Sequence, residues 1–524
     1  MTRTQHAARI VALMIVASGL LGWLARHTGI LFADGLRYVE QAKRIDYGAL
    51  SDGLFRSVDH PAYPVTIALV HRALGSDNGP EAWQAAAQIA AILAGIALMM
   101  PLYLVTLELF GDRAAWLACL LAIMVPQTGH VLADALSEST FLLFWLWGLW
   151  TALRFLRDGA FGWLPPMIGF AALAYLSRPE GLLLPAALVA TLGLLPLLRS
   201  TRMNWPRWWA AIGFLVLGPG MLIGPYVAMK GGLGTKPAVQ RMLGTAPRSA
   251  PDAVERQRPL DPNQSTARTY AQAGRAVLIA IRDAATLPVL ALAALGFARA
   301  WPPGVRSRAW LLLGVIAVAS VLALIRLHAT GGYCSPRHAM VLAFLLFPAA
   351  AAGLDGVLRS AAIPGRWLGL GEGRFTAGPA VWALVLVGFG AWCAPNTLAP
   401  LNDSNAGYRD AGYWLKQNVP ATAWVVDVTG WSLFYGERPG YTFANLDDTA
   451  RDPNIRWVIA REAHLRGPWR YCDRLRRLVG EREPIVIFPV DPRPKQSKVF
   501  VFDLLSAPIQ QARAEPGPIQ PDRR

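Results

Sequence analysis

Residues 33–64 read ADGLRYVEQAKRIDYGALSDGLFRSVDHPAYP, and they follow directly on an apolar segment of transmembrane length. Ionisable side chains this close to hydrocarbon are costly and are therefore usually functional or paired. The stretch predicts a membrane protein that presents a charged site at the surface of the bilayer. Its five carboxylates are Asp34, Glu40, Asp46, Asp52 and Asp59.

The composition is that of a polytopic membrane protein. Hydrophobic residues make up 54% of the 524 positions and charged residues only 16%, against roughly 25% in soluble domains. The net charge of +16 does not indicate nucleic acid, because the arginines crowd into loops expected to face the cytoplasm. The four cysteines lie far apart without a CxxC pair, so they indicate neither a disulfide framework nor a zinc site.

Apolar segments close to the ~20 residues that cross the hydrocarbon recur along the first part of the chain. They predict an all-α polytopic membrane domain with about eleven transmembrane helices. A shorter apolar piece, 61–75, contains His71 and Arg72 and is predicted to lie in the interface. The predicted spans are 10–28, 83–107, 113–130, 137–153, 162–177, 181–198, 208–229, 279–298, 309–327, 338–358 and 377–397.

Basic residues gather in alternate loops between these spans, as the positive-inside rule requires. If the N-terminus is cytoplasmic, the outer face receives residues 29–62 and the whole chain after 398. The charged stretch is therefore predicted to face outside. The weak point is 279–298, where two charges and Pro288 leave a short apolar core. If that segment does not cross, every later assignment inverts.

The composition changes after Pro400, where a small soluble α/β domain is predicted. An amphipathic helix is expected at 408–420, and segments rich in Val, Ile and Phe predict strands. The domains are therefore 1–400 in the membrane, 401–510 as a periplasmic α/β domain, and 511–524 as a disordered tail. The predicted strands are 423–428, 455–460, 484–490 and 498–504.

Asp34, in the sequence FADGLRY, is the first candidate catalytic residue. A carboxylate beside a Tyr and an Arg at the membrane surface can take a proton from a hydroxyl group. The same residue also fits a helix N-cap, and the local sequence leaves both interpretations open. Asp59 and His60 close the same loop, and His60 can donate to a phosphate or support a carboxylate.

A second pair of carboxylates, Asp134 and Glu138, lies at the predicted outer start of the fourth span. Their spacing of four residues is expected to put both on one helical face. Such groups are usually functional or paired, and a helix cap is the alternative.

Arginines at the outer surface run against the positive-inside bias and so suggest a specific anion. Arg178 and Glu180 share one short outer connection, and Arg326, Arg337 and His338 flank another. Arg makes bidentate contacts with phosphate. Pairing of Arg178 with Glu180, or of the arginines with lipid headgroups, remains the alternative.

Two motifs in this order resemble a known family. Asp34-Gly35-Leu36-Arg37-Tyr38 follows the first span, and His60-Pro61-Ala62-Tyr63-Pro64 ends the outer loop. Together they resemble the GT-C glycosyltransferases, in particular the dolichyl-phosphate-mannose–protein mannosyltransferases and the lipid A aminoarabinose transferases. Further likeness comes from Leu136-Ser137-Glu138, Ser177-Arg178-Pro179-Glu180-Gly181 and Ser335-Pro336-Arg337-His338.

The resemblance implies a GT-C-type membrane domain over roughly 10–400. It implies that Asp34 lies near the acceptor hydroxyl and that Arg178, Arg326 and Arg337 surround the lipid phosphate. Many relatives carry Asp-Glu where this chain has Asp34-Gly35. If a second carboxylate is needed, Asp59 or Glu138 has to supply it.

The predicted function is inverting glycosyl transfer from a polyprenyl-phosphate sugar to an acceptor hydroxyl at the periplasmic face of a bacterial inner membrane. The acceptor is a lipid, a glycan or a protein, and membrane lipids are the other partners. The predicted catalytic residues are Asp34, Asp59 and Glu138. The predicted substrate-binding residues are Tyr38, His60, Tyr63, Asp134, Arg178, Glu180, Arg326, Arg337 and His338.

Two alternatives stay open. A divalent cation, Mg²⁺ or Mn²⁺, could bind these carboxylates, since hard cations favour oxygen ligands, although no residue is assigned as a metal ligand. A lipid or glycan transporter or flippase is the rival function. It would place its site near the bilayer midplane between two related halves, whereas the charges here cluster at one face and no related halves are recognisable.

Overall fold

The chain divides into two compact units, and each is described by itself. One unit ends at Leu401 and the other begins at Asn402. The computed structural model describes residues 2–75, 77–197, 205–245, 266–300, 306–360, 362–364, 374–376, 379–450, 452, 455–467, 470–494 and 496–505. The tail predicted at 511–524 lies outside the described residues.

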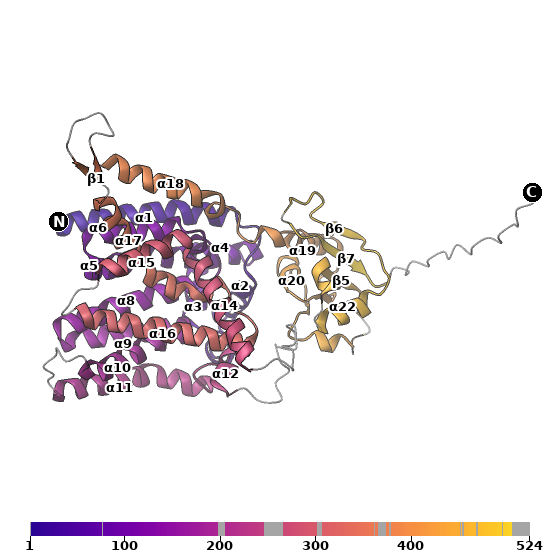
Figure 1. Ribbon diagram of the computed structural model, residues 1–524. Coiled ribbons are helices and arrows are strands. Elements are labelled where there is room, and N and C mark those ends of the chain that lie inside the picture. Colours follow the sequence, from indigo (N-terminus) through magenta and orange to yellow (C-terminus); the bar gives the residue numbers. More distant parts are fainter. Residues whose placement is uncertain are drawn as a thin grey trace, which may run out of the picture. The chain divides into compact units, whose positions relative to one another are not determined.

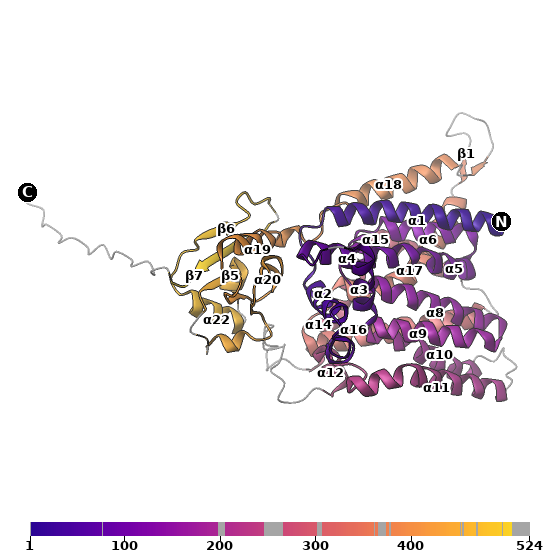
Figure 2. The ribbon, with the colours of Figure 1, turned by 180° about the vertical axis from the view of Figure 1, so that it is seen from behind.

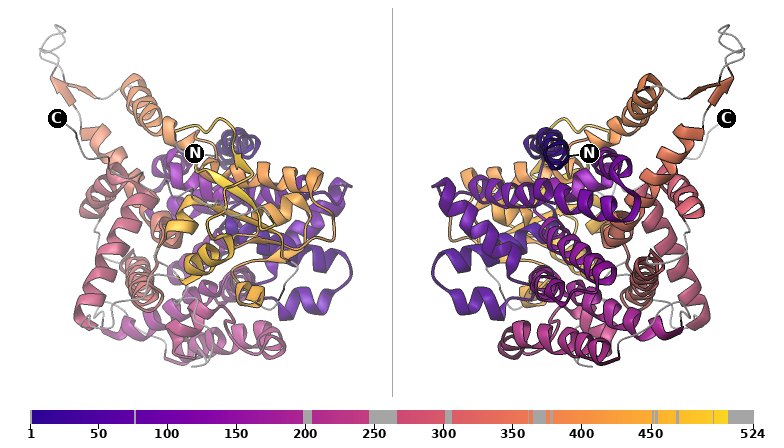
Figure 3. Two further views of the ribbon diagram at one scale, coloured as in Figure 1. Left: turned by 90° about the vertical axis from the view of Figure 1, so that its right-hand side faces the viewer. Right: turned by 90° about the vertical axis from the view of Figure 1, so that its left-hand side faces the viewer.

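The first unit is a bundle whose long helices run side by side (Figures 1 and 2). Figure 3 shows the N-terminal helix α1 of this bundle end-on. The helices are α1 (Arg3–Arg26), α2 (Ala33–Asp46), α3 (Ala62–Leu74), α4 (Pro80–Ala97), α5 (Met99–Phe110), α6 (Asp112–Met124), α7 (Pro126–Ala133), α8 (Glu138–Asp158), α9 (Leu164–Ser177), α10 (Leu183–Leu194), α11 (Trp205–Lys230), α12 (Pro237–Leu243), α14 (Thr266–Ala285), α15 (Leu287–Ala300), α16 (Arg306–Gly331), α17 (Met340–Ser360) and α18 (Pro379–Thr397).

Short elements connect these helices. A π-helical turn follows α2, and 3-10 turns join α8 to α9, α9 to α10 and α16 to α17. They are η1 (Asp52–Arg56), η2 (Phe161–Trp163), η3 (Pro179–Leu182), η4 (Leu195–Leu197) and η5 (Pro336–Ala339), together with the antiparallel strands β1 (Ala362–Pro364) and β2 (Arg374–Thr376).

Among the described residues, six helices are long and apolar enough to cross a membrane, or eight if each of two bent pairs counts as one span. Three shorter apolar helices, Phe161–Ser177, Pro179–Leu194 and Val381–Thr397, fall at three of the other predicted spans. The outer helices expose large apolar side chains such as Leu217 and Met221 on α11. Such a surface suits lipid better than water.

Two predicted spans are not straight helices. Residues 113–130 bend by 74° between α6 and α7, where Val125 is extended before Pro126, as the residue before a proline prefers. The predicted span 279–298 is interrupted as well. The chain bends there by 94° between α14 and α15, at Thr286, whose φ is +73°.

The second unit is a small domain around a five-stranded mixed sheet with strand order β4-β3-β5-β7-β6. β3 pairs in parallel with β4 and β5, while β7 runs antiparallel to β5 and β6. The predicted helix and four strands correspond to α19, β3, β5, β6 and β7. The elements are η7 (Asp403–Asn405), α19 (Gly407–Asn418), β3 (Val425–Asp427), α20 (Trp431–Gly436), β4 (Gly440–Tyr441), η8 (Leu446–Ala450), β5 (Trp457–Arg461), α21 (Glu462–Arg466), α22 (Arg470–Val479), β6 (Val486–Phe488) and β7 (Val499–Asp503).

Candidate active site

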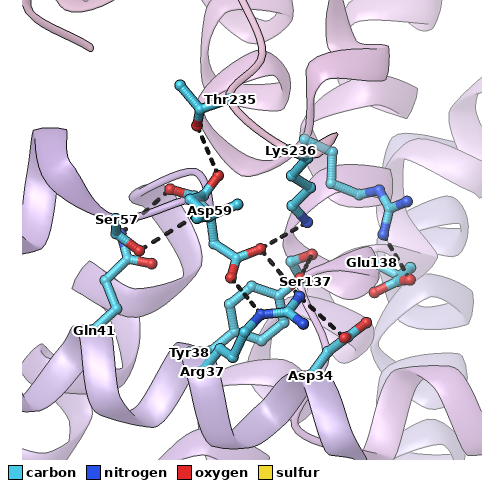
Figure 4. Close-up of polar contacts among 12 residues, drawn as sticks. Asp34, Arg37, Tyr38, Gln41, Ser57, Asp59, Ser137, Glu138, Thr235 and Lys236 are labelled. Carbon is cyan, nitrogen blue, oxygen red and sulfur yellow. Dashed lines mark hydrogen bonds and ion pairs between the residues drawn. The ribbon is translucent and has the colours of Figure 1, made fainter. Parts of the chain in front are cut away.

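Asp34 lies in the first turn of α2 and faces two arginines. Phe32 is the N-cap of this helix and makes no side-chain cap bond, so the alternative that Asp34 caps α2 is wrong. Arg37, one turn further along, places Nη2 3.0 Å from Asp34 Oδ1. Arg337, on η5, forms an ion pair with the other carboxylate oxygen. Asp34 is thus held between cations from two separate segments, and Figure 4 shows the contact with Arg37.

Asp59 continues this arrangement in the loop before α3. Its carboxylate accepts Arg37 Nε at 3.0 Å and lies 2.7 Å from Nζ of Lys236, just before α12. Figure 4 shows Arg37 between the two aspartates, with Lys236 reaching the Asp59 carboxylate beside it. Arg37 therefore links the two carboxylates of the outer loop.

Glu138 opens α8 on the other side of Arg337. Its Oε1 is 2.6 Å from Arg178 Nη1 and 3.8 Å from Arg337 Nη1. Arg178 also reaches Glu180 at 2.8 Å. The eight residues joined in this way alternate in charge, and we call them the ion-pair chain: Lys236, Asp59, Arg37, Asp34, Arg337, Glu138, Arg178 and Glu180.

The three predicted catalytic carboxylates differ in solvent exposure. The Asp34 side chain is 17% exposed, whereas those of Asp59 and Glu138 are 2% exposed. A general base must reach the proton that it abstracts. Of the three, Asp34 is therefore the carboxylate most accessible from outside the protein.

The neighbouring cations govern the protonation of Asp34 and Asp59. Burial by itself raises the pKa of the Asp34 carboxyl, but Arg337, Arg37 and Lys236 outweigh it and hold the pKa well below its usual range. Burial likewise opposes ionisation of Asp59, and Lys236 and Arg37 again lower its pKa. Both carboxylates are ionised at neutral pH because nearby positive charge stabilises the anion.

A second set of contacts fixes the loop that carries Asp59. Lys230, at the end of α11, donates from Nζ to the backbone oxygens of Ser57 at 3.1 Å and Asp59 at 2.8 Å. Thr235 donates from Oγ1 to the backbone oxygen of Val58 at 3.1 Å. Three consecutive carbonyls of this loop are thus satisfied by side chains of residues 230–235.

The predicted tyrosines lie beneath the ion-pair chain. The Tyr38 hydroxyl is 3.0 Å from Oγ of Ser137, as Figure 4 shows. Tyr63 donates its hydroxyl to the backbone oxygen of Ala87 at 2.8 Å, and its ring meets Tyr38 edge-on at 5.2 Å. Both are fully buried, so they pack α2 and α3 against the bundle.

His60 is enclosed by aromatic rings. Its ring meets Tyr175 edge-on at 4.9 Å and lies 6.1 Å from Tyr226. Burial, with Lys230 and Lys236 nearby, lowers the pKa of His60 to about 3. The imidazole is therefore neutral at physiological pH, and it can donate a hydrogen bond but carries no positive charge toward a phosphate.

Asp134 does not share a helical face with Glu138, so that prediction is wrong. It follows the last residue of α7, where the helix has ended, and Glu138 begins α8. Its Oδ1 accepts the backbone N–H groups of Phe32 at 3.3 Å and Ala135 at 2.8 Å. Asp134 therefore ties the chain before α2 to the turn before α8.

The remaining predicted residues occupy different places. His338 accepts the backbone N–H of Ser335 at Nδ1, 3.1 Å away, and so closes the turn that carries Arg337. Arg326 donates to the Tyr270 hydroxyl at 2.7 Å, and none of its described contacts joins it to the ion-pair chain.

Sequence reasoning did not include Arg37 or Lys236 in the predicted site. Arg37 was recognisable from its position one helical turn after Asp34, a spacing at which opposite charges pair. Lys236 carries no comparable local signal, because its partner Asp59 lies far away in the chain.

The packing around Gly35 is close. A Cβ atom at Gly35 would lie 3.0 Å from both Cβ and the backbone oxygen of Ala135, which is tighter than ordinary van der Waals contact. The position next to Asp34 therefore has little room for a side chain. Asp59 and Glu138 are the other carboxylates close to Asp34's partners.

The residues present do not fit a divalent cation. Among the described residues, no group of three or more His, Cys, Asp or Glu side chains is arranged to hold a metal ion. Asp34, Asp59 and Glu138 each face at least one guanidinium or ammonium group at ion-pair distance.

Comparison with known proteins relates part of this chain to a family of glycosyltransferases. Residues 61–223 match the family of dolichyl-phosphate-mannose-protein mannosyltransferases, which confirms the resemblance predicted from the two motifs. Among curated proteins, none matches the chain.

Two solved enzymes share the fold. ArnT from Cupriavidus metallidurans, bound to undecaprenyl phosphate, has a TM-score of 0.59 at 14% identity, covering 95% of this chain and 98% of that chain. The oligosaccharyltransferase of Archaeoglobus fulgidus, in the apo form, has a TM-score of 0.56 at 14% identity, covering 87% of this chain and 70% of that chain. The latter enzyme, AglB, has also been solved with a dolichol-phosphate, and with zinc and sulfate.

These likenesses relate residues 61–223 to the mannosyltransferase family and show that the chain shares the fold of the multi-pass membrane enzyme ArnT. The structural likeness shows the fold, and the family match runs from the start of α3 into α11, where it ends before Lys230. Sugar, acceptor and the roles of single residues are matters of proposal.

Proposed function

We propose that the protein is an inverting glycosyltransferase that moves a sugar from a polyprenyl-phosphate donor to an acceptor hydroxyl at the periplasmic face of a bacterial inner membrane. The family match over 61–223 supports a lipid-phosphate sugar as donor. The observation that carries the proposal is the partly exposed Asp34 carboxylate, held between Arg37 and Arg337 at the outer ends of the helices.

Asp34 is the proposed general base. The acceptor O–H bond breaks and its proton passes to the Asp34 carboxylate. The acceptor oxygen forms a bond to the anomeric carbon from the side opposite the phosphate, so the configuration inverts. The bond between the anomeric carbon and the phosphate oxygen breaks, and its electron pair stays on the polyprenyl phosphate.

Arg337 is the proposed partner of the leaving phosphate. Its Nε and Nη1 atoms are buried without a hydrogen-bond partner in the described part of the chain, although Nη1 lies 3.8 Å from Glu138. Buried donors of this kind normally have an acceptor. Charge-assisted bonds to the departing phosphate stabilise the negative charge that develops there.

The other predicted residues support this arrangement. Arg178 acts through Glu138, which it holds beneath Arg337, because its guanidinium is already shared by two carboxylates. Arg37 and Lys236 are further cations beside Asp34. The binding roles first predicted for Tyr38, His60 and Tyr63 become packing roles, whereas Arg326 has no place in this proposed site.

A lipid flippase is the rival, and the position of the charges disfavours it. The ion-pair chain is built from helix ends and connecting turns, namely the start of α2, the start of α8, the end of α9 and η5. A transporter would hold its charges near the middle of interrupted helices. The soluble unit after Leu401 is proposed to lie in the periplasm, on the same side as this site.

The test is turnover of an undecaprenyl-phosphate sugar by the purified full chain in detergent. Asp34→Asn removes the proton acceptor with little change in shape, and loss of a general base costs roughly 10²–10⁴-fold in rate. Asp52→Asn is the matched control, because Asp52 lies in the same outer loop and pairs with the exposed Arg56. Wild-type turnover by a folded Asp34→Asn variant would contradict the assignment of the base.

A further inference from the structure

The base of the proposed reaction is neutralised in the structure as it stands. Asp34 is paired with Arg37 on its own helix and with Arg337 from η5, and Lys236 also contributes positive charge. A carboxylate stabilised in this way is a weak proton acceptor, because each cation favours its ionised form. Efficient proton abstraction requires that one of these cations leave.

Arg337 is the cation that is free to change partners. Arg37 is held on both sides, since its Nε also contacts Asp59 at 3.0 Å. Arg337 is shared between Asp34 and Glu138, at a longer distance to the latter. Two of its nitrogens are buried without a hydrogen-bond partner among the residues that the structure describes. Its guanidinium also lies over the Phe32 ring, 4.6 Å from the ring centre.

We propose that Asp34 and the donor phosphate compete for Arg337, so that donor binding moves Arg337 from the carboxylate to the phosphate and turns Asp34 into an effective base. This inference rests on the proposed function, because it requires a lipid-phosphate donor. It implies an ordered reaction in which the donor binds before the acceptor is activated.

The same exchange would also stabilise the transition state more than the bound donor. The donor is a phosphodiester with one negative charge, and the phosphate gains negative charge as its bond to the sugar breaks. The attraction of Arg337 for the phosphate therefore grows toward the transition state, which is the kind of interaction that accelerates a reaction. Arg37, Lys236 and Glu138 remain as the charged groups next to Asp34 and Arg337.

Competition for one cation must work in both directions. If Asp34 withholds Arg337 from the phosphate, removing the Asp34 charge should tighten phosphate binding. Simple repulsion between Asp34 and the phosphate predicts a gain as well. The two explanations differ only when Arg337 is absent, because repulsion persists without Arg337 and competition does not.

The experiment measures binding of undecaprenyl phosphate, without sugar, to the purified full chain in detergent. We expect Asp34→Asn to bind about tenfold more tightly than wild type, the size of one charge-assisted hydrogen bond. Arg337→Gln should bind undecaprenyl phosphate more weakly than wild type. Adding Asp34→Asn to Arg337→Gln should not increase the affinity. Glu180→Gln is the matched control. It removes one negative charge from the same chain without touching Arg337, so its effect should be the same with and without Arg337.

The outcomes separate the inference from the function on which it rests. If the wild-type protein does not bind undecaprenyl phosphate, the donor class is wrong and both fall. If the wild-type protein binds undecaprenyl phosphate but Asp34→Asn does not tighten binding, the proposed exchange of Arg337 is overturned while the proposed donor stands. The same holds if Asp34→Asn tightens binding equally in the Arg337→Gln background. Should Arg337→Gln fail to fold by its melting curve, Arg337→Met takes its place in the cycle. There the gain from Asp34→Asn should again be lost, because methionine carries no charge for which the carboxylate and the phosphate could compete.

Discussion

Arg178 Nη1 lies 2.6 Å from Oε1 of Glu138, and both side chains are almost sealed from solvent. Glu138 comes from the start of α8, whereas Arg178 follows the end of α9. The pair therefore locks two helix ends together directly beneath Arg337. A buried ion pair is not by itself a large source of stability, but removing one partner leaves an uncompensated charge.

Replacing Glu138 by Gln should consequently destabilise the protein strongly. We expect a loss of about 3 kcal/mol, near the lower end for a broken buried pair, because Glu180 still faces Arg178. The measurement is thermal unfolding in detergent. Glu180→Gln is the control, since its side chain is 45% exposed and exposed pairs contribute about 1 kcal/mol or less. Equal melting temperatures for the two variants would argue against this account.

The ion pairs of Asp59 should appear in the pH dependence of stability. Its pKa in the folded protein is lowered by Lys236 and Arg37 against the effect of burial. A carboxyl group whose folded pKa is depressed contributes stability above its unfolded pKa of about 3.9, and this is lost as the pH falls through the folded pKa. The melting temperature should therefore hold from pH 8 to 5 and fall below about pH 4. Asp59→Asn should be less stable at pH 7 and decline less steeply.

His60 should not add a titration step to the pH–rate profile near neutrality. Its pKa is lowered to about 3 by burial and by the two lysines, so the ring stays neutral where an ordinary histidine would titrate, at about pH 6.5. Turnover of wild type and of His60→Gln, both measured between pH 5 and 8, should give curves of the same shape. A step near pH 6.5 that disappears in the variant would show that His60 is charged in the working enzyme.

The sidedness of the chain can be tested directly. If residues 29–62 and the unit after Leu401 lie outside the cytoplasm, a reporter fused after Asn405 should behave as periplasmic. A second fusion after Asp158, at the opposite end of α8, should report the cytoplasm. A cytoplasmic signal from the first fusion would place the candidate site on the wrong face for a periplasmic donor.

Much of the helical architecture follows from apolar runs, since any segment that crosses hydrocarbon must be long, apolar and internally hydrogen-bonded. The breaks were harder to predict. Pro126 marks the bend before α7 in the sequence. Thr286 adopts a positive φ, and no pattern in the surrounding sequence predicts it. In the soluble unit the longer strands were recognisable, whereas β4 has two residues and is too short to show an alternating pattern.

The sequence predicts those site residues that lie at the ends of predicted spans, but not the contacts that depend on tertiary packing. Asp34, Glu138, Arg178 and Arg337 stand at predicted outer ends of spans, and the structure brings them together. Lys236 lies in a long loop, where a charge is usually only solvated, and its contact with Asp59 depends on tertiary packing. Arg326 sits near the same predicted surface but pairs with Tyr270.

The alternation of sign along the ion-pair chain has a consequence for how this site can change over time. Deleting any interior member brings two like charges next to each other, so the remaining neighbours repel where they had been bridged. A single substitution is therefore poorly tolerated, whereas a matched exchange of two adjacent members restores the balance. In related sequences, Asp59 and Lys236 are accordingly expected to be substituted together rather than singly. The same is expected of Glu138 and Arg178.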